Sequence, residues 1–140
     1  MARYRQERND MQLHLPIVTP KAWGEEIEII NNELYCAKIL RFRPFGKFSC
    51  HFHAKKHEGW YFLHPVEVRW VDTSTATKHS LMAKAGDCLV VNRLVPHQIY
   101  NYNDFWAEVY EVSTHHEDTD SYRIEPGDSQ KTLDKSPKSV

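Results

Sequence analysis

Several features are scarce in this sequence of 140 residues, and each absence excludes a class of protein. No apolar run approaches the length of about 20 residues that a membrane-spanning helix needs. The first ten residues carry charge but lack the apolar segment of a secretory signal peptide. Neither sign of charge dominates, since 18 lysines and arginines meet 19 aspartates and glutamates. We therefore expect no binding to nucleic acid or to anionic membranes.

Cysteine is also rare. The three cysteines, Cys36, Cys50 and Cys88, form no close pair and no spacing typical of a metal site. An odd number without a signal peptide fits a reducing compartment, so we expect a cytoplasmic protein. Cys50 and Cys88 are interpreted as small buried hydrophobic residues rather than as nucleophiles.

Long amphipathic helices are not expected, because no segment sustains an apolar period of 3.6 residues over three turns. Short segments rich in β-branched and aromatic residues recur instead, with turn residues between them. The predicted strands are Glu25–Asn31, Tyr35–Arg43, Phe48–His53, Gly59–Leu63, Val66–Val71, Lys78–Met82, Cys88–Asn92 (as a short buried strand), His97–Asn101 and Phe105–Thr114. This pattern predicts an all-β sandwich or barrel.

The length of the chain fits one domain with a sizeable core. Residues 1–20 are expected to form an extended N-terminal arm, because Pro16 and Pro20 disfavour a helix. Residues 21–125 hold the predicted strands of the barrel. Residues 126–140 have the composition of a disordered tail.

Three possible metal ligands, His51, His53 and Glu58, lie within eight residues. On a strand, His51 and His53 point to the same face, about 6.6 Å apart. Two imidazoles at that separation can bind one ion at about 2.1 Å from each nitrogen. Glu58 follows after enough chain for a tight turn and the start of a returning strand. We therefore predict a hairpin with two imidazoles on one arm and a carboxylate on the other.

A fourth ligand, His97, is expected from the stretch between Gly86 and Asn101. In a barrel this second hairpin can face the first, which gives a site assembled across two sheets. Three imidazoles and one carboxylate suit Mn, Fe, Co, Ni or Zn and do not choose between them. Coordination positions left open allow a substrate with two vicinal oxygens to chelate one divalent metal ion.

The two stretches resemble the two motifs of the cupin superfamily. Residues 46–58 read G-x4-H-x-H-x4-E, and residues 86–101 read G-x10-H-x3-N. The resemblance implies a cupin double-stranded β-helix, or jelly-roll barrel. It also implies that His51, His53, Glu58 and His97 hold the metal. The departures from the usual motifs, at Pro65, Asn92 and Leu94 and in the spacing before His51, concern turns rather than ligands.

The flanks resemble a narrower group. K-A-W-G at residues 21–24 and S-Y-R-I-E at residues 121–125 are similar to the flanks of type II phosphomannose isomerases and of small sugar isomerase-like cupins. This resemblance implies a metal-dependent isomerase that converts a sugar or sugar phosphate between aldose and ketose forms. Two alternatives stay open: an Fe(II)-dependent cupin dioxygenase with the same ligands, and a non-catalytic sugar-binding module.

Five further residues are candidates for chemistry or substrate binding. Glu111 is the candidate base that moves a proton between C1 and C2, with an outer-surface position as the alternative. Lys38 is the second candidate catalytic residue. It shares a face with Leu40 and Phe42, so its ammonium either reaches the pocket, where it can hold a substrate hydroxyl, carboxylate or phosphate, or lies in water at the barrel mouth. Arg123 suits an anionic substrate group, or pairs with an acidic neighbour. Trp60 and Phe62 share parity with Glu58, and either line the pocket or belong to the core.

The lead-in from Leu13 to Val18 is apolar and precedes the first predicted strand of the barrel. An exposed strand of this kind can add to the sheet edge of a neighbouring chain. We therefore expect a homodimer.

Overall fold

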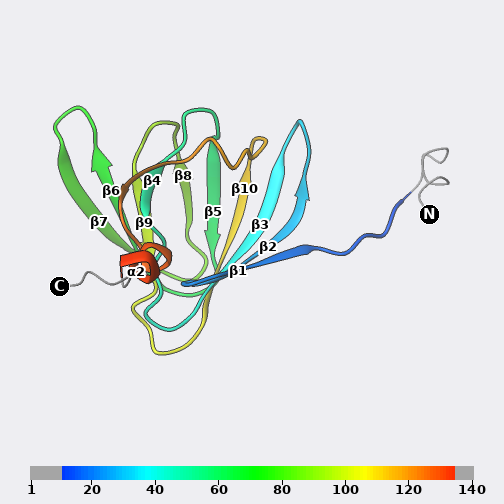
Figure 1. Ribbon diagram of the computed structural model, residues 1–140, viewed down its shortest axis with the longest axis horizontal. Helices are drawn as coiled ribbons and strands as arrows, with labels where there is room; N and C mark the ends of the chain where they lie inside the picture. Colours follow the sequence, from blue (N-terminus) through cyan, green and yellow to red (C-terminus); the bar gives the residue numbers. More distant parts are fainter. Residues whose placement is uncertain (1–10, 135–140) are drawn as a thin grey trace.

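The computed structural model describes residues 11–134, with the side chains of 132–134 left out, and it contains two antiparallel β-sheets (Figure 1). The first sheet has the order β1 (Ile17–Lys21), β2 (Gly24–Asn31), β3 (Cys36–Phe42), β10 (Ala107–Ser113), β5 (Glu58–Phe62) and β8 (Cys88–Val91). The second has the order β11 (Tyr122–Glu125), β4 (Cys50–Phe52), β9 (His97–Tyr100), β6 (Val66–Asp72) and β7 (Thr77–Ala83). Each predicted strand is thus present, within a few residues at its ends.

The two predicted hairpins are wrong in their pairing. Strand β4 belongs to the second sheet and β5 to the first, and β8 and β9 are divided in the same way. In a jelly roll the chain passes repeatedly from one sheet to the other, so successive strands need not pair. Each motif therefore spans the space between the sheets, and Glu58 faces the histidines from the opposite sheet.

The core lies between the sheets, and β3, β5 and β10 each contribute alternate residues to it. On β3, Lys38, Leu40 and Phe42 are buried, while the residues between them are partly exposed. Phe42 is fully buried, stacks on Trp23 at 4.8 Å between ring centroids, and lies 5.6 Å from Phe48. The alternation predicted for this strand is confirmed, and it directs Lys38 inward.

Gly24 explains the tight start of β2. Its φ angle is +151°, and a Cβ atom at this position would lie 1.8 Å from the carbonyl oxygen of Arg41. Only glycine lets the two backbones approach this closely. The close approach of the two backbones therefore explains why the K-A-W-G segment has glycine at position 24.

The two ends of the chain are described in part. Residues 11–16 are exposed without regular structure, and residues 17–21 form β1 against β2. Within the range expected to be a disordered tail, Asp128–Asp134 forms helix α2, tied to the barrel by two hydrogen bonds between Lys47 and Asp128. The rest of both expectations, residues 1–10 and 135–140, lies outside the described residues.

The expectation that Cys50 and Cys88 are both buried is correct for only one of them. Cys50 is buried as predicted, but Cys88 is exposed because β8 lies at the edge of its sheet, and of the four residues of β8 only Val91 is buried. All three cysteines are free thiols.

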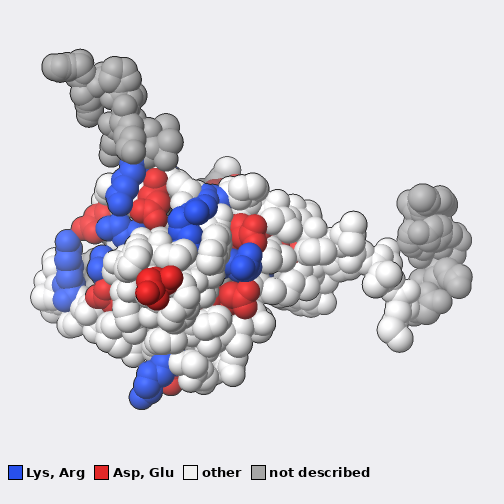
Figure 2. Space-filling model, turned by 90° about the horizontal axis from the view of Figure 1, so that it is seen from below, with Lys and Arg blue, Asp and Glu red and all other residues white. Residues whose placement is uncertain are grey.

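On the face in Figure 2, positive and negative side chains are interspersed. Among the described residues, no helix has both the length and the apolar character that crossing a membrane requires.

Candidate metal centre

Three histidines form a cluster on the inner face of the second sheet. His51 on β4 lies directly opposite His97 on β9, because these two residues are cross-strand partners. His53 follows β4 and points to the same face as His51. One ring nitrogen from each histidine lies within 4.8 Å of those of the other two, so the three can hold a metal ion. The prediction that a distant strand supplies His97 is correct, but the three imidazoles come from one sheet.

Backbone carbonyl groups fix the orientation of all three rings. The Nδ1 of His51 donates to the carbonyl oxygen of Ser49 at 2.7 Å, and that of His97 donates to Val95 at 2.9 Å. The Nδ1 of His53 donates to the carbonyl oxygen of Asp120. A proton on each Nδ1 leaves the Nε2 lone pair free to face the cluster centre. Anchoring of this kind sets the tautomer of a metal-binding histidine and makes it a better ligand.

Glu58 completes the cluster from β5 of the opposite sheet. Its Oε2 lies 3.5 Å from Nε2 of His53 and 3.4 Å from Nε2 of His97. The side chain is only 3% exposed, and among the described residues this oxygen has no hydrogen-bond partner. A buried carboxylate oxygen without a partner is costly, whereas a cation at the cluster centre would satisfy it.

The protonation of the cluster favours a cation as well. Burial lowers the pKa of His97 to about 4 and that of His51 well below its ordinary value, so both rings are neutral near pH 7. Burial and the charge of Glu111 raise the pKa of Glu58 to about 8. A divalent cation reverses the preference of this carboxyl, because it favours the ionised form. The four residues therefore fit one divalent transition metal.

A buried ion pair lies beside the cluster. The Nζ of Lys56 donates to Oε2 of Glu111 at 2.9 Å, and it lies 3.9 Å from Oε1 of Glu58. Lys56 is 4% exposed and Glu111 is 5% exposed. Burial opposes the ionisation of Glu111, but the charge of Lys56, its hydrogen bond and the charge of Lys38 together outweigh burial and lower the pKa of the carboxyl. Glu111 thus lies inside the barrel, and the outer-surface alternative for it does not hold.

Lys56 was not found from the sequence. It stands in the run A-K-K-H-E, whose charge is typical of a solvated loop, while its neighbour Lys55 is exposed and pairs with Glu117. The one available signal was its position two residues before Glu58. The loop must bring that carboxylate into the barrel, and it brings Lys56 in with it.

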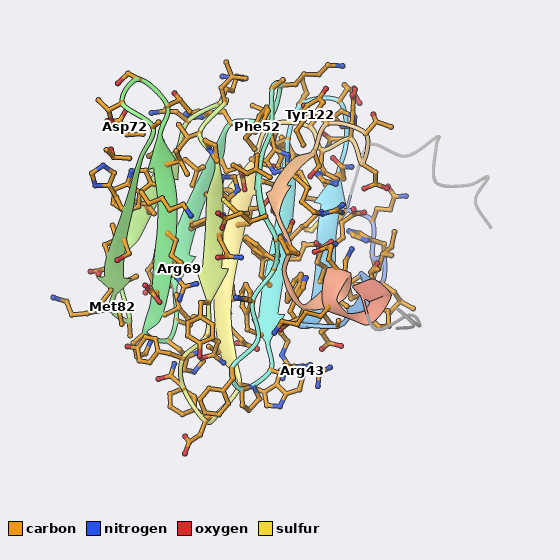
Figure 3. All side chains as sticks on the ribbon, turned by 60° about the vertical axis from the view of Figure 1, so that its left-hand side comes forward. Arg43, Phe52, Arg69, Asp72, Met82 and Tyr122 are labelled. Atoms are coloured by element: carbon orange, nitrogen blue, oxygen red, sulfur yellow. The ribbon has the colours of Figure 1, made fainter. Side chains whose placement is uncertain are left out.

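Asp120 holds the loop between His53 and Glu58, which contains Lys56. Its carboxylate accepts backbone hydrogen bonds from Ala54, Lys55 and Lys56 at 2.8–3.2 Å, and its carbonyl oxygen orients His53. It precedes β11, which is anchored on β4 by the stacked rings of Phe52 and Tyr122, 5.1 Å apart (Figure 3). Asp120 therefore supports the loop that carries two candidate ligands.

The cluster forms part of the lining of a cavity of about 360 Å³, which we call the polar cavity. Besides the cluster, its lining includes the polar side chains of Lys38, Lys56, Glu111, His116, Arg123, Ser49, Ser121 and Ser129, and the apolar side chains of Trp23, Leu40 and Phe48. Lys38 is 5% exposed and its Nζ donates to Glu26 at 3.3 Å, so it is an interior residue rather than a residue in open water. Arg123, on the exposed strand β11, lies opposite His51 in the strand register.

The aromatic pair of β5 lies elsewhere. Trp60 and Phe62 are 2% and 1% exposed and do not line the polar cavity. Each pair of residues along a strand advances about 6.6 Å, so these rings lie beyond Glu58 in the core. The ring of Trp60 packs edge-on against His97, with centroids 5.3 Å apart. Of the two alternatives for these residues, core packing is correct, and the expectation that they line the pocket is wrong.

No family model matches the chain, and a search of curated proteins found no match. Solved structures do match. The capsular polysaccharide assembling protein CapF from Staphylococcus aureus superposes with a TM-score of 0.72 at 14% identity, over 81% of this chain and 33% of that one. Oxalate decarboxylase from Bacillus subtilis, in a form studied for its Mn(II) centres, gives a TM-score of 0.68 at 17% identity, over 78% of this chain and 30% of that one.

These matches show the fold. Together with the two antiparallel sheets, they confirm the predicted all-β architecture of the cupin double-stranded β-helix. The chain spans about a third of the length of the solved structures it matches. The comparison therefore shows the fold alone, and the metal site and the reaction are argued from this chain's own residues.

Proposed function

We propose that this protein is a metal-dependent, sugar isomerase-like cupin that interconverts the aldose and ketose forms of a sugar or sugar phosphate. The observation that carries the proposal is the buried pair of Lys56 and Glu111, 2.9 Å apart, in the same polar cavity as the histidine cluster. Aldose–ketose isomerisation needs a base beside an electrophile in a site protected from water. The cavity offers residues for both roles.

His51, His53, His97 and Glu58 would hold the metal ion. Bound there, a divalent ion supplies Lewis acidity to substrate oxygens on neighbouring carbons. The donor set does not select among Mn, Fe, Co, Ni and Zn. The hydrogen bonds from the three Nδ1 atoms to backbone carbonyl oxygens orient the ligand nitrogens before any substrate binds.

Glu111 is the proposed base. Its carboxylate is ionised in the resting site, since Lys56 lowers its pKa, and it can take the proton from C2 of an aldose and return it to C1. Lys56 keeps its proton, because Glu111 and Glu58 raise the pKa of its ammonium against the effect of burial. The ammonium thus holds Glu111 in position and balances its charge before the proton moves.

The lining of the cavity supports a polyhydroxylated substrate. Serine hydroxyls and the charged side chains of Lys38 and Arg123 can bind hydroxyl groups, and the two cations also suit a phosphate. We assign the holding of substrate oxygens to Lys38, whose ammonium is buried beside the cavity. A fold neighbour described as assembling capsular polysaccharide is consistent with a carbohydrate.

Deuterium exchange tests the proposal directly. The metal-loaded protein is incubated in D2O with mannose, fructose and their 6-phosphates, and deuterium at C1 and C2 is followed by NMR. We expect exchange with at least one pair, and its loss in Glu111→Gln with the metal content unchanged. Glu117→Gln, a change of the same kind at a partly exposed residue, is the control and should retain exchange.

Two results would reject the isomerase. One is exchange that persists undiminished in Glu111→Gln, which removes the proposed base. The other is no exchange with any of these sugars, together with oxygen consumption by the iron-loaded protein. That second result would favour the dioxygenase alternative. Sugar binding by calorimetry without exchange or oxygen consumption would favour the non-catalytic module.

A further inference from the structure

Lys56 lies between two carboxylates that have different proposed roles. Its Nζ is 2.9 Å from Oε2 of Glu111, the proposed base, and 3.9 Å from Oε1 of Glu58, a candidate metal ligand. A shift of about 1 Å would therefore bring the ammonium to Glu58 instead. Each of the three residues is at most 5% exposed, so either ion pair would be strong. The other contacts of the ammonium thus influence which carboxylate it binds.

His116 provides such a contact. Its Nδ1 lies 3.2 Å from Nζ of Lys56. An ammonium has donors but no lone pair, so Nδ1 accepts this hydrogen bond and the ring proton is on Nε2. The Nε2 in turn donates to Oδ1 of Asp118 at 2.9 Å. Burial and the charges of Lys56 and Lys38 lower the pKa of His116, which fits a neutral ring near pH 7 with an accepting Nδ1.

The position of His116 is fixed through its backbone. Asn31, the last residue of β2, accepts a hydrogen bond from the N–H of His116 at 3.1 Å and donates one to its carbonyl oxygen at 3.0 Å. These two bonds tie the residue to the first sheet whatever its side chain is. The pair with Asp118 adds little, because the side chain of Asp118 is 99% exposed. The ring therefore meets Lys56 from an anchored position.

We propose that His116 is a positioning residue that keeps the ammonium of Lys56 on Glu111. Glu58 thereby stays available to a metal ion. The acceptors on His116 and Glu111 take two of the three N–H donors of the ammonium, and both lie on the side away from the histidine cluster's carboxylate. An ammonium bonded to Glu58 would cancel the charge of that ligand and would place a positive charge beside the incoming cation.

The inference rests on the metal centre of the proposed function, and it does not use the isomerase reaction. Calorimetric titration of the full chain with Mn²⁺, without any substrate, is the first test. His116→Leu removes the acceptor and keeps the backbone bonds to Asn31. It should weaken Mn²⁺ binding about 10–100-fold, the range for loss of a group that supports a metal ligand.

Two variants serve as controls. His116→Asn places an amide oxygen near the position of Nδ1, where it can accept from Lys56, so it should bind Mn²⁺ within about threefold of the wild type. His115→Leu makes the same change at the preceding residue, which is exposed and whose Nδ1 donates to the carbonyl oxygen of Asn32. It should also stay within about threefold of the wild type.

A double-mutant cycle separates positioning from a general effect on the fold. In a Lys56→Met background no ammonium remains that could move to Glu58. His116→Leu should therefore change the Mn²⁺ dissociation constant by less than about threefold in that background. An equal loss of affinity in both backgrounds would overturn the proposal, because His116 would then act without Lys56.

Crystal structures of the metal-free wild type and of His116→Leu give a readout that does not depend on metal binding. We expect Nζ of Lys56 within about 3.2 Å of Glu111 in the wild type and of Glu58 in the variant. An ammonium that stays on Glu111 in the variant would overturn the proposal. If the ammonium moves as expected but the wild type binds no Mn²⁺, the positioning role of His116 is supported and the metal centre of the proposed function is rejected.

Discussion

Replacing Asp120 by alanine tests whether its buried carboxylate holds the loop from residue 54 to residue 57 in place. Asp120 is only 3% exposed, and its carboxylate accepts hydrogen bonds from three successive backbone N–H groups. That loop connects His53 to Glu58, so its position decides whether the imidazoles and the carboxylate meet. No other described side chain bonds to all three of these groups.

The size of the effect follows from the three hydrogen bonds. Bonds to an ionised acceptor contribute about 1.5–3 kcal/mol each when both partners are buried. The N–H of Lys56 is buried, whereas those of exposed Ala54 and Lys55 can bond to water after the change. We therefore expect Asp120→Ala to lower the free energy of unfolding by about 2–4 kcal/mol. For a chain of this length that lowers the Tm by about 7–13 °C.

Chemical denaturation of the metal-free protein near pH 7 is the assay. Asp118→Ala is the matched control. It removes the same charge two residues away in the sequence, and the side chain of Asp118 is 99% exposed. It should change the free energy of unfolding by less than about 0.5 kcal/mol. Equal stability of the two variants would refute the reasoning. Although burial opposes ionisation, the backbone bonds lower the pKa of Asp120, so the deficit of Asp120→Ala should shrink as the pH falls below about 4.

Two further predictions concern the ligand set and the backbone. Metal affinity should rise about tenfold per pH unit up to about pH 8 and then level off, because the cation must displace the proton of Glu58, whose pKa is about 8. Calorimetric titrations at several pH values measure this, and a flat profile in the wild type would contradict it, whereas Glu58→Gln should lose the slope. Gly24→Ala should destabilise the fold by more than about 3 kcal/mol, because its Cβ would overlap the Arg41 carbonyl oxygen. Gly86→Ala, where a Cβ meets nothing within 4 Å but φ is +93°, should cost about 1–2 kcal/mol in the same denaturation assay, and equal losses would refute the overlap.

Local patterns were sufficient to predict the strands and the cluster. Alternation along β3 identified its buried face correctly, including Lys38. The spacing of His51 and His53 put both rings on one face, and the second motif brought His97 to them. These features depend on side-chain period and on short spacing, which are readable from sequence.

What was missed depends on which sheet each strand joins. Periodicity does not state that β4 and β5 lie in opposite sheets, so the predicted hairpins failed although Glu58 still reaches the histidines. Lys56 and Asp120 lie in charged runs that are typical of solvent-exposed loops. Asp120 becomes an interior residue because β11 packs beside β4, a contact between segments some 70 residues apart, and Lys56 is carried inward by the loop that brings Glu58 into the barrel.

The remaining error concerns β8, the strand at the edge of the first sheet. Cys88 and Val90 are apolar or weakly polar, so the strand was expected to be buried. Strand β8 is instead outermost in its sheet, and Val90 is 63% exposed. Composition cannot show that a strand is outermost, because the same residues suit a central strand.

The central claim is that three imidazoles and one carboxylate from opposite sheets hold one divalent cation. Anomalous diffraction from crystals grown with Mn²⁺ tests it most directly. We predict one strong peak per chain, about 2.0–2.3 Å from Nε2 of His51, His53 and His97 and from the unpaired Oε2 of Glu58. A cluster without a peak at saturating metal, or a peak that excludes His97, would contradict the account.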